Sequence, residues 1–159
     1  MHTMQNRPLV LGLLLAQALL ISCTAPTTGT PRDDGVKPLQ VTSSSSALRF
    51  DAATIDSASI AGDVLSLHVT HGGGCTTHTF GLHTSGIFLE SYPVQVPAQL
   101  SHDAADDRCR ALVRPVLRFD LSALRTLYQK AYGARGELVL NVQAPGGGGA
   151  STSVRYVIQ

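Results

Sequence analysis

Two neighbouring segments in the middle of the chain carry apolar residues with a period of two. In residues 64–71 one face holds Leu65, Leu67, Val69 and His71, and in residues 76–82 His78, Phe80 and Leu82 occupy alternate positions. A period of two predicts β-strands with one buried face. The glycines at 72–74 supply the positive φ angles that a tight or bulged hairpin needs. This pattern commits the centre of the chain to antiparallel sheet, and any fold must be built around it.

The remaining chain adds short strands and one helix. Further strands are expected at residues 53–61, 87–90, 94–101, 110–119, 137–143 and 153–158, with prolines 93, 97 and 115 at edges or bends. A helical stripe covers residues 121–132, where Asp120 can cap the helix and Gly133 can end it. Seven or eight evenly spaced strands with one short crossover helix predict an antiparallel β-sandwich of the Ig-like or Greek-key type. The glycines at 146–149 are expected to form its last hairpin loop.

Composition supports one packed domain and excludes some partners. Of the 159 residues 43% are hydrophobic, which is enough for a core. Twelve basic side chains against eleven acidic ones leave no excess of positive charge for nucleic acid. We therefore expect no nucleic-acid partner.

Residues 1–22 have the features of an export signal. An apolar run at 9–21 follows Arg7 and is shorter than the roughly 20 residues of a membrane-spanning helix. It ends in Leu20-Ile21-Ser22-Cys23, which resembles the bacterial lipobox. The resemblance implies a diacylglycerol on Cys23, cleavage before it and acylation of the new N-terminus, so the membrane is an expected partner. Thr24, in place of an aspartate, favours the outer membrane, on its periplasmic or surface face.

Residues 23–46 are rich in Thr, Pro, Ser and Gly and show no apolar period. Such composition is typical of a flexible tether. We therefore expect a lipidated N-terminus and linker over 23–46, followed by the β-sandwich over 47–159.

Lipidation of Cys23 would leave two cysteines, Cys75 and Cys109. An exported domain lies in an oxidising compartment, where two thiols are most simply one disulfide. The loop that this disulfide closes implies about 4 kcal/mol of stabilisation through the unfolded state.

Five of the six histidines lie between positions 68 and 102. His71, Cys75 and His78 surround the glycine hairpin, and His102 lies further along the chain. Zinc accepts two imidazoles with one or two thiolates, whereas His71, His78 and His102 alone could bind zinc or copper with the cysteines oxidised. Solvent-facing or hydrogen-bonded structural histidines explain the same pattern. The sequence favours this last interpretation, and hence no cofactor.

Two other hypotheses concern the same region. Asp103, Asp106 and Asp107 concentrate three carboxylates in one loop, as in a calcium site, although Asp is also a common turn residue. Cys75 and His78 could pair as nucleophile and base, but side chains three apart on a strand point to opposite faces. The sequence contains no nucleophile elbow, zinc-protease helix, phosphate loop or dinucleotide fingerprint. We therefore expect a protein without enzymatic activity.

The centre of the chain resembles uncharacterised bacterial lipoproteins. The similarity rests on His71-Gly72-Gly73-Gly74-Cys75-Thr76-Thr77-His78-Thr79-Phe80, Leu100-Ser101-His102-Asp103, Asp107-Arg108-Cys109-Arg110-Ala111 and Phe119-Asp120-Leu121. It is loosely similar to the β-sandwich domain of NigD-like lipoproteins, without a match to that family's N-terminal barrel. The resemblance implies a β fold and an envelope location but no activity. The expected function is non-enzymatic binding of an envelope protein or component, or a structural role, and the alternative is periplasmic metal binding.

Overall fold

A computed structural model describes residues 35–44, 46–146 and 151–159, which fall in one compact unit. The signal segment, Cys23 and the glycines at 147–149 lie outside the described residues. Within the described part of the chain, no helix is both long and apolar enough to cross a membrane.

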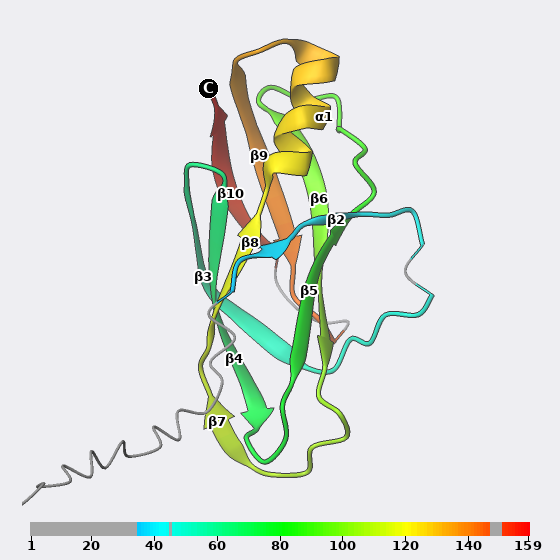
Figure 1. Cartoon of the computed structure of the whole chain (residues 1–159), viewed down its shortest axis with the longest axis vertical. Helices are drawn as coiled ribbons and strands as arrows, with labels where there is room; N and C mark the ends of the chain where they lie inside the picture. The colour runs from blue at the N-terminus through cyan, green and yellow to red at the C-terminus, as the bar shows by residue number, and fades with distance from the viewer. Residues whose placement is uncertain (1–34, 45, 147–150) are drawn as a thin grey trace, which may run out of the picture. The chain divides into compact units, whose positions relative to one another are not determined.

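The chain folds into two five-stranded sheets and one helix (Figure 1). The first sheet has the order β1 (Lys37–Pro38), β8 (Val116–Asp120), β4 (Val64–Gly73) and β3 (Ala53–Ala61), with β7 (Ala111–Val113) also paired to β4. The second sheet has the order β10 (Ser151–Ile158), β9 (Gly136–Gln143), β6 (Val94–Asp103), β5 (Thr79–Thr84) and β2 (Gln40–Val41). Helix α1 (Ser122–Tyr132) connects β8 to β9.

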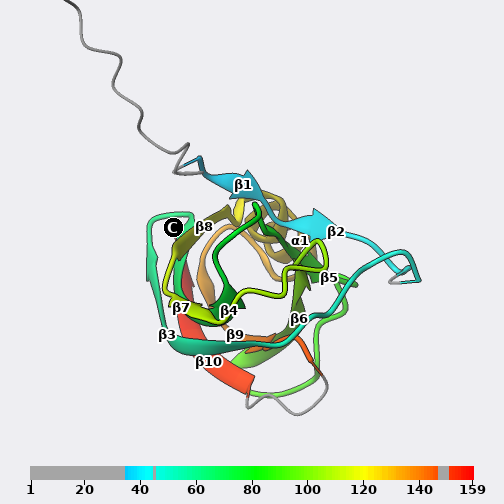
Figure 2. The ribbon, with the colours of Figure 1, turned by 90° about the horizontal axis from the view of Figure 1, so that it is seen from below.

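The two sheets enclose one hydrophobic core (Figure 2). In β4 the side chains of Leu65, Leu67 and Val69 are buried while His68 is exposed, as the period of two predicts. Val96 and Leu100 of β6 contribute to the same core from the second sheet. The prediction of a β-sandwich with one short helix is confirmed.

The sheets are mixed, whereas the sequence predicts antiparallel ones. The pairs β1–β8, β2–β5 and β6–β9 run parallel, and the other strand pairs run antiparallel. Strand β9 lies parallel to β6 because the chain passes through the first sheet and α1 before it returns. A parallel pair needs such a long crossover connection, which strand spacing alone does not reveal.

Several boundaries differ from those expected. Residues 37–41, assigned above to the linker, form β1 and β2, because the buried side chain of Leu39 ties this segment to the core. Residues 87–90 contribute only one isolated bridge, from Leu89 to Gln95, instead of a strand. The run 110–119 divides into β7 and β8 on either side of residues 114–115.

Helix α1 begins and ends near the expected residues. The Asp120 carboxylate accepts hydrogen bonds from the Ser122 amide (2.8 Å) and hydroxyl (3.0 Å), with Leu121 at the N-cap position. Gly133 ends the helix at φ 105°, which glycine adopts readily. Leu124 and Tyr128 face the core.

Candidate metal centre

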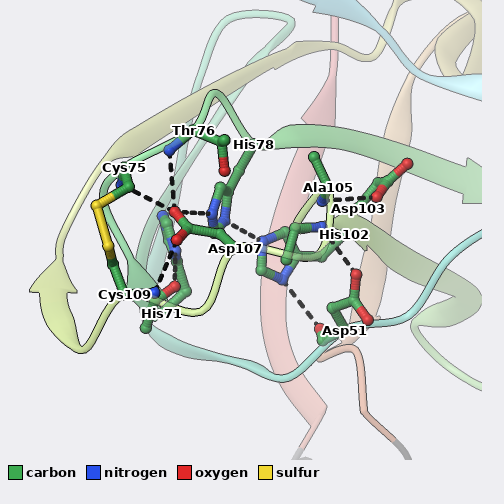
Figure 3. A network of polar contacts seen from close by, with 12 residues as sticks. Asp51, His71, Cys75, Thr76, His78, His102, Asp103, Ala105, Asp107 and Cys109 are labelled. Carbon is green, nitrogen blue, oxygen red and sulfur yellow. Dashed lines mark hydrogen bonds and ion pairs between the residues drawn. A yellow bond between two sulfur atoms is a disulfide. The ribbon is translucent and has the colours of Figure 1, made fainter.

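His71, His78 and His102 come together where the two sheets meet. His71 is in β4 of the first sheet, His102 is in β6 of the second, and His78 directly precedes β5. The ring centroids are 4.4 Å apart for His71 and His78, 5.1 Å for His71 and His102, and 5.0 Å for His78 and His102. The structure thus unites the three histidines that the sequence identifies as candidate ligands (Figure 3).

Strand periodicity explains why these histidines point inward. His71 continues the buried positions of β4, and His102 lies two residues after Leu100 on the buried face of β6. His71 and His102 are 6% and 1% exposed, and the His78 side chain is 4% exposed. Three polar rings therefore occupy one end of a hydrophobic core, where each needs partners for its nitrogens.

Each histidine has one ring nitrogen bonded to an oxygen outside the cluster. His71 Nδ1 lies 2.8 Å from the carbonyl oxygen of Gly72, and His102 Nδ1 lies 3.0 Å from that of Asp51. His78 Nε2 lies 3.2 Å from Asp107 Oδ2. Carbonyl groups and an ionised carboxylate only accept hydrogen bonds, so all three of these outer nitrogens carry a proton. This is the arrangement by which proteins orient metal-binding imidazoles.

The other ring nitrogens of His78 and His102 face each other. His78 Nδ1 and His102 Nε2 are 2.8 Å apart, and one ring nitrogen from each of the three histidines lies within 4.8 Å of the other two. Lone pairs at 2.8 Å repel, so a shared proton or a metal cation must lie between His78 and His102. Nitrogens around a tetrahedral zinc ion are roughly 3.4 Å apart, given Zn–N bonds of about 2.0–2.1 Å. The His78–His102 pair is closer than this separation, and all three ligand nitrogens lie within 4.8 Å of one another.

The Asp107 carboxylate is the buried anion of the centre. Its Oδ1 accepts a hydrogen bond from the Cys109 amide (2.8 Å), and its Oδ2 accepts from the amides of Cys75 (2.8 Å) and Thr76 (3.0 Å). These bonds, first that of Cys109 and then that of Thr76, hold the pKa of Asp107 well below its usual range. Asp107 therefore stays ionised beside His78.

A glycine makes this contact possible. A Cβ atom at Gly73 would lie 2.6 Å from His78 Nε2 and 3.0 Å from Asp107 Oδ2. The φ angle of Gly73 is 126°, a conformation that other residues rarely adopt. The predicted hairpin at the triple glycine is wrong, because β4 and β5 belong to different sheets and do not pair. The glycines instead lie where the chain passes from one sheet to the other, and Gly73 leaves room for the His78–Asp107 pair.

His102 is held as a neutral imidazole. Burial lowers its pKa, while the hydrogen bond to the Asp51 carbonyl acts in the opposite direction. Its ring stacks on Phe80 with centroids 4.3 Å apart and planes at 2°. The neutral form is the one that binds metal ions.

Cys75 and Cys109 form the predicted disulfide. The bond consumes both thiolates, so the mixed cysteine–histidine zinc site and the Cys75 nucleophile are not formed in this oxidised state. The disulfide joins the segment between β4 and β5 to the segment before β7, with Asp107 bonded to both (Figure 3).

The calcium hypothesis fails on geometry. Asp103 Oδ1 accepts from the Ala105 amide, Asp106 pairs with Arg49 at 3.2 Å, and Asp107 faces the cysteines. Asp103 also lies 3.9 Å from the Arg49 guanidinium, so Asp103 and Asp106 share one cationic partner while Asp107 is directed to other groups. The proximity of the three residues in sequence reflects turn formation.

Sequence reasoning missed the residues that orient the histidines. Asp107 was visible only as one of three acidic loop residues, although its place two before Cys109 suits a side-chain bond to that amide. Asp51 acts through its backbone carbonyl, which carries no sequence signal. The sequence identifies Phe80 only as an apolar strand position.

Comparison with known proteins shows the fold. No family model and no curated protein matches the sequence. A NigD-like immunity protein from Bacteroides caccae matches with TM-score 0.53 and 18% identity over 77% of this chain and 64% of that chain. A protein described as toxin-related from Parabacteroides distasonis matches with TM-score 0.52 and 20% identity over 76% and 61%. An uncharacterised protein from Parabacteroides merdae matches with TM-score 0.51 and 8% identity over 77% and 66%.

The chain spans less than two thirds of the length of the first two of these proteins. Identities of 20% or less show shared architecture and carry no function across. The cysteine and histidine pattern suggests a resemblance to the β-sandwich of NigD-like proteins. The comparison supports this resemblance at the level of architecture.

Proposed function

We propose that this chain is a lipid-anchored protein of the bacterial cell envelope that binds zinc or copper through His71, His78 and His102. The observation that carries the proposal is the convergence of three buried imidazoles whose outer nitrogens are all bonded to oxygen acceptors. Imidazole nitrogens suit both metals. Asp107 contributes the negative charge that a buried cation needs.

The role that fits this geometry is binding without catalysis. The ligands are almost fully buried, so the ion would be held between the sheets instead of being presented to a substrate. Because His71 belongs to the first sheet and His102 to the second, a bound ion would tie the two sheets together. The centre would store or sense a metal ion, or strengthen the fold.

The lipobox-like ending at Cys23 supports an anchor, with the outer membrane as the proposed location. The Cys75–Cys109 disulfide is consistent with an oxidising compartment outside the cytoplasm. The linker before Lys37 would then hold the domain near the bilayer.

Isothermal titration calorimetry with Zn²⁺ and Cu²⁺ tests the metal centre. The protein is the full chain carrying Cys23→Ser, oxidised and stripped of metal. We expect one ion bound per chain, and His71→Asn should weaken binding at least tenfold. His68→Asn is the matched control, because His68 is exposed on the same strand. Absence of binding, or equal weakening by both substitutions, would refute the proposal.

An exposed apolar surface supports a second function, binding of an envelope protein. In the loop between β5 and β6, Ile87 is 64% exposed and Tyr92 is fully exposed. The neighbouring Phe88 contacts the half-exposed Tyr132 of α1, with ring centroids 5.3 Å apart. Exposed apolar side chains on one loop beside a helix support an interaction site there. Cross-linking of intact cells should capture a partner with the wild type and lose it with Ile87→Ser and Tyr92→Ser combined.

A further inference from the structure

The cysteine segments are held together by more than their disulfide. Asp107 accepts hydrogen bonds from the backbone amides of both Cys75 and Cys109. Strands β4 and β7, which flank these segments, are also paired, from His71 with Val113 to Gly73 with Ala111. None of these bonds involves sulfur, so the two cysteines would stay close after the S–S bond is broken.

The same three residues form a set of metal ligands. One oxygen of Asp107 and the sulfurs of Cys75 and Cys109 all lie within 4.8 Å of one another. Asp107 Oδ1 accepts one hydrogen bond, from the Cys109 amide, and a carboxylate oxygen has two lone pairs. A lone pair therefore remains on this oxygen for a cation.

Exposure distinguishes this set from the histidine centre. Cys75 is exposed and Cys109 is half-buried, whereas His71 and His102 are buried and the side chain of His78 is 4% exposed. A reductant can therefore reach the disulfide without opening the core.

We propose that reduction of the Cys75–Cys109 disulfide opens a second metal site at the surface, in which two thiolates and Asp107 bind a soft cation, zinc or copper(I). The proposal deepens the proposed metal-binding function and rests on it, because Asp107 bonds both the backbone amides of the two cysteines and the ring of His78. Thiolates select these softer ions. The oxidised chain would offer imidazoles alone, and the reduced chain would offer both donor sets.

The chemistry requires a two-electron reductant, such as a dithiol. It transfers two electrons and two protons to the disulfide, which becomes the thiols of Cys75 and Cys109, while the dithiol closes to its own disulfide. Each thiol then releases its proton as the thiolate binds the ion.

Cobalt(II) is a suitable probe because thiolate ligands produce an intense near-ultraviolet charge-transfer band that imidazoles do not. The protein is the full chain carrying Cys23→Ser, which leaves Cys75 and Cys109 as its cysteines. The chain is reduced with a phosphine, freed of the phosphine without oxygen and titrated with Co²⁺. We expect the charge-transfer band in the reduced chain, with one more ion bound than in the oxidised chain.

Matched variants separate this proposal from the histidine centre. His71→Asn combined with His102→Asn should abolish binding to the oxidised chain and leave the band of the reduced chain. If the oxidised wild type fails to bind Co²⁺ while the reduced wild type shows the charge-transfer band, the histidine centre is refuted. If the reduced wild type shows no band, the thiolate site is refuted, whether circular dichroism shows the reduced chain to be folded or unfolded.

The contribution of Asp107 to the proposed thiolate site is tested separately. Asp107→Asn should weaken Co²⁺ binding to the reduced chain about tenfold, whereas Asp106→Asn, at an exposed position of the same loop, should not. Equal affinity in both variants would show that the cysteines bind the ion without a built site, which would overturn the proposal.

Discussion

His78 Nδ1 and His102 Nε2 lie 2.8 Å apart, and in each ring the other nitrogen is bonded to an oxygen acceptor outside the cluster. His78 directs Nε2 to Asp107, whereas His102 directs Nδ1 to the Asp51 carbonyl. The two rings are thus fixed in opposite orientations by partners on different segments. Only a proton or a metal ion satisfies both inner nitrogens, and this relationship underlies the first prediction.

Metal binding should stabilise the folded chain. Zinc at one hundred times its dissociation constant is expected to add about 2.7 kcal/mol to the free energy of unfolding. For a domain of this size that corresponds to a rise in Tm of about 10 °C. Differential scanning calorimetry of the oxidised chain with and without Zn²⁺ measures the rise. His102→Asn should abolish it, and a rise that persists in this variant would place the ion elsewhere.

The buried Tyr156 hydroxyl should give stability a dependence on alkaline pH. It donates a hydrogen bond to Asp63, which also pairs with Arg125. Burial, reinforced by Asp63, raises the pKa of Tyr156 above its ordinary value of 10.0. The folded chain therefore keeps this proton when the unfolded chain begins to lose it. The stability contributed by this hydroxyl is full below about pH 10 and decreases progressively as the pH rises above that value, toward the raised pKa of the folded chain.

Urea denaturation at pH 8 and pH 11 checks this dependence. At pH 8, Tyr156→Phe should lower the free energy of unfolding by about 1–2 kcal/mol, because a hydrogen bond to a charged group is lost. At pH 11 the difference from the wild type should be smaller. Tyr92→Phe, at a fully exposed position, should follow the wild type at both pH values. A difference that grows with pH would contradict the assigned direction.

Much of the fold follows from local pattern, whereas the site depends on long-range contacts. The alternation that buries Leu65 and Leu67 is visible in the sequence, and so are the helix and the disulfide. The parallel pairing of β6 and β9 is not visible, because it depends on where the chain returns after α1. The histidines could be named as candidates, but their convergence required the register between strands of different sheets.

The groups that orient the histidines are even harder to identify from the sequence. Asp51 acts through a carbonyl oxygen, and every residue except proline presents the same backbone groups. In the sequence nothing distinguishes Asp107 from its neighbours Asp103 and Asp106. In the folded loop the Asp107 side chain is buried, whereas those of Asp103 and Asp106 are not. Side-chain identity therefore identifies candidate ligands better than it identifies the groups that orient them.

Removal of the Asp107 carboxylate should damage both stability and metal binding. Asp107→Ala leaves the amides of Cys75, Thr76 and Cys109 without an acceptor and removes the partner of His78. We expect a loss of about 2–4 kcal/mol in the free energy of unfolding. Zn²⁺ affinity of the oxidised chain should also decrease, by about tenfold or more.

Chemical denaturation and calorimetry measure the two effects of Asp107→Ala. The comparison is Asp106→Ala, since Asp106 is exposed and pairs only with Arg49 among the described contacts. This change should alter stability by no more than about 0.5 kcal/mol. Similar losses in both variants would show that the loop as a whole, and not the buried carboxylate, supports the centre.

Gly73→Ala should distort the centre without removing any of its ligands. The new methyl group would lie 2.6 Å from His78 Nε2, and the φ angle of 126° is strained for alanine. His78 must then move away from Asp107, so we expect weaker Zn²⁺ binding and a loss of stability of about 1–3 kcal/mol. The adjacent Gly72→Ala is the control, because a Cβ atom there meets nothing within 4 Å. If the Gly73 variant binds zinc as tightly as the Gly72 variant, the contact between His78 and Asp107 does not orient the metal ligand.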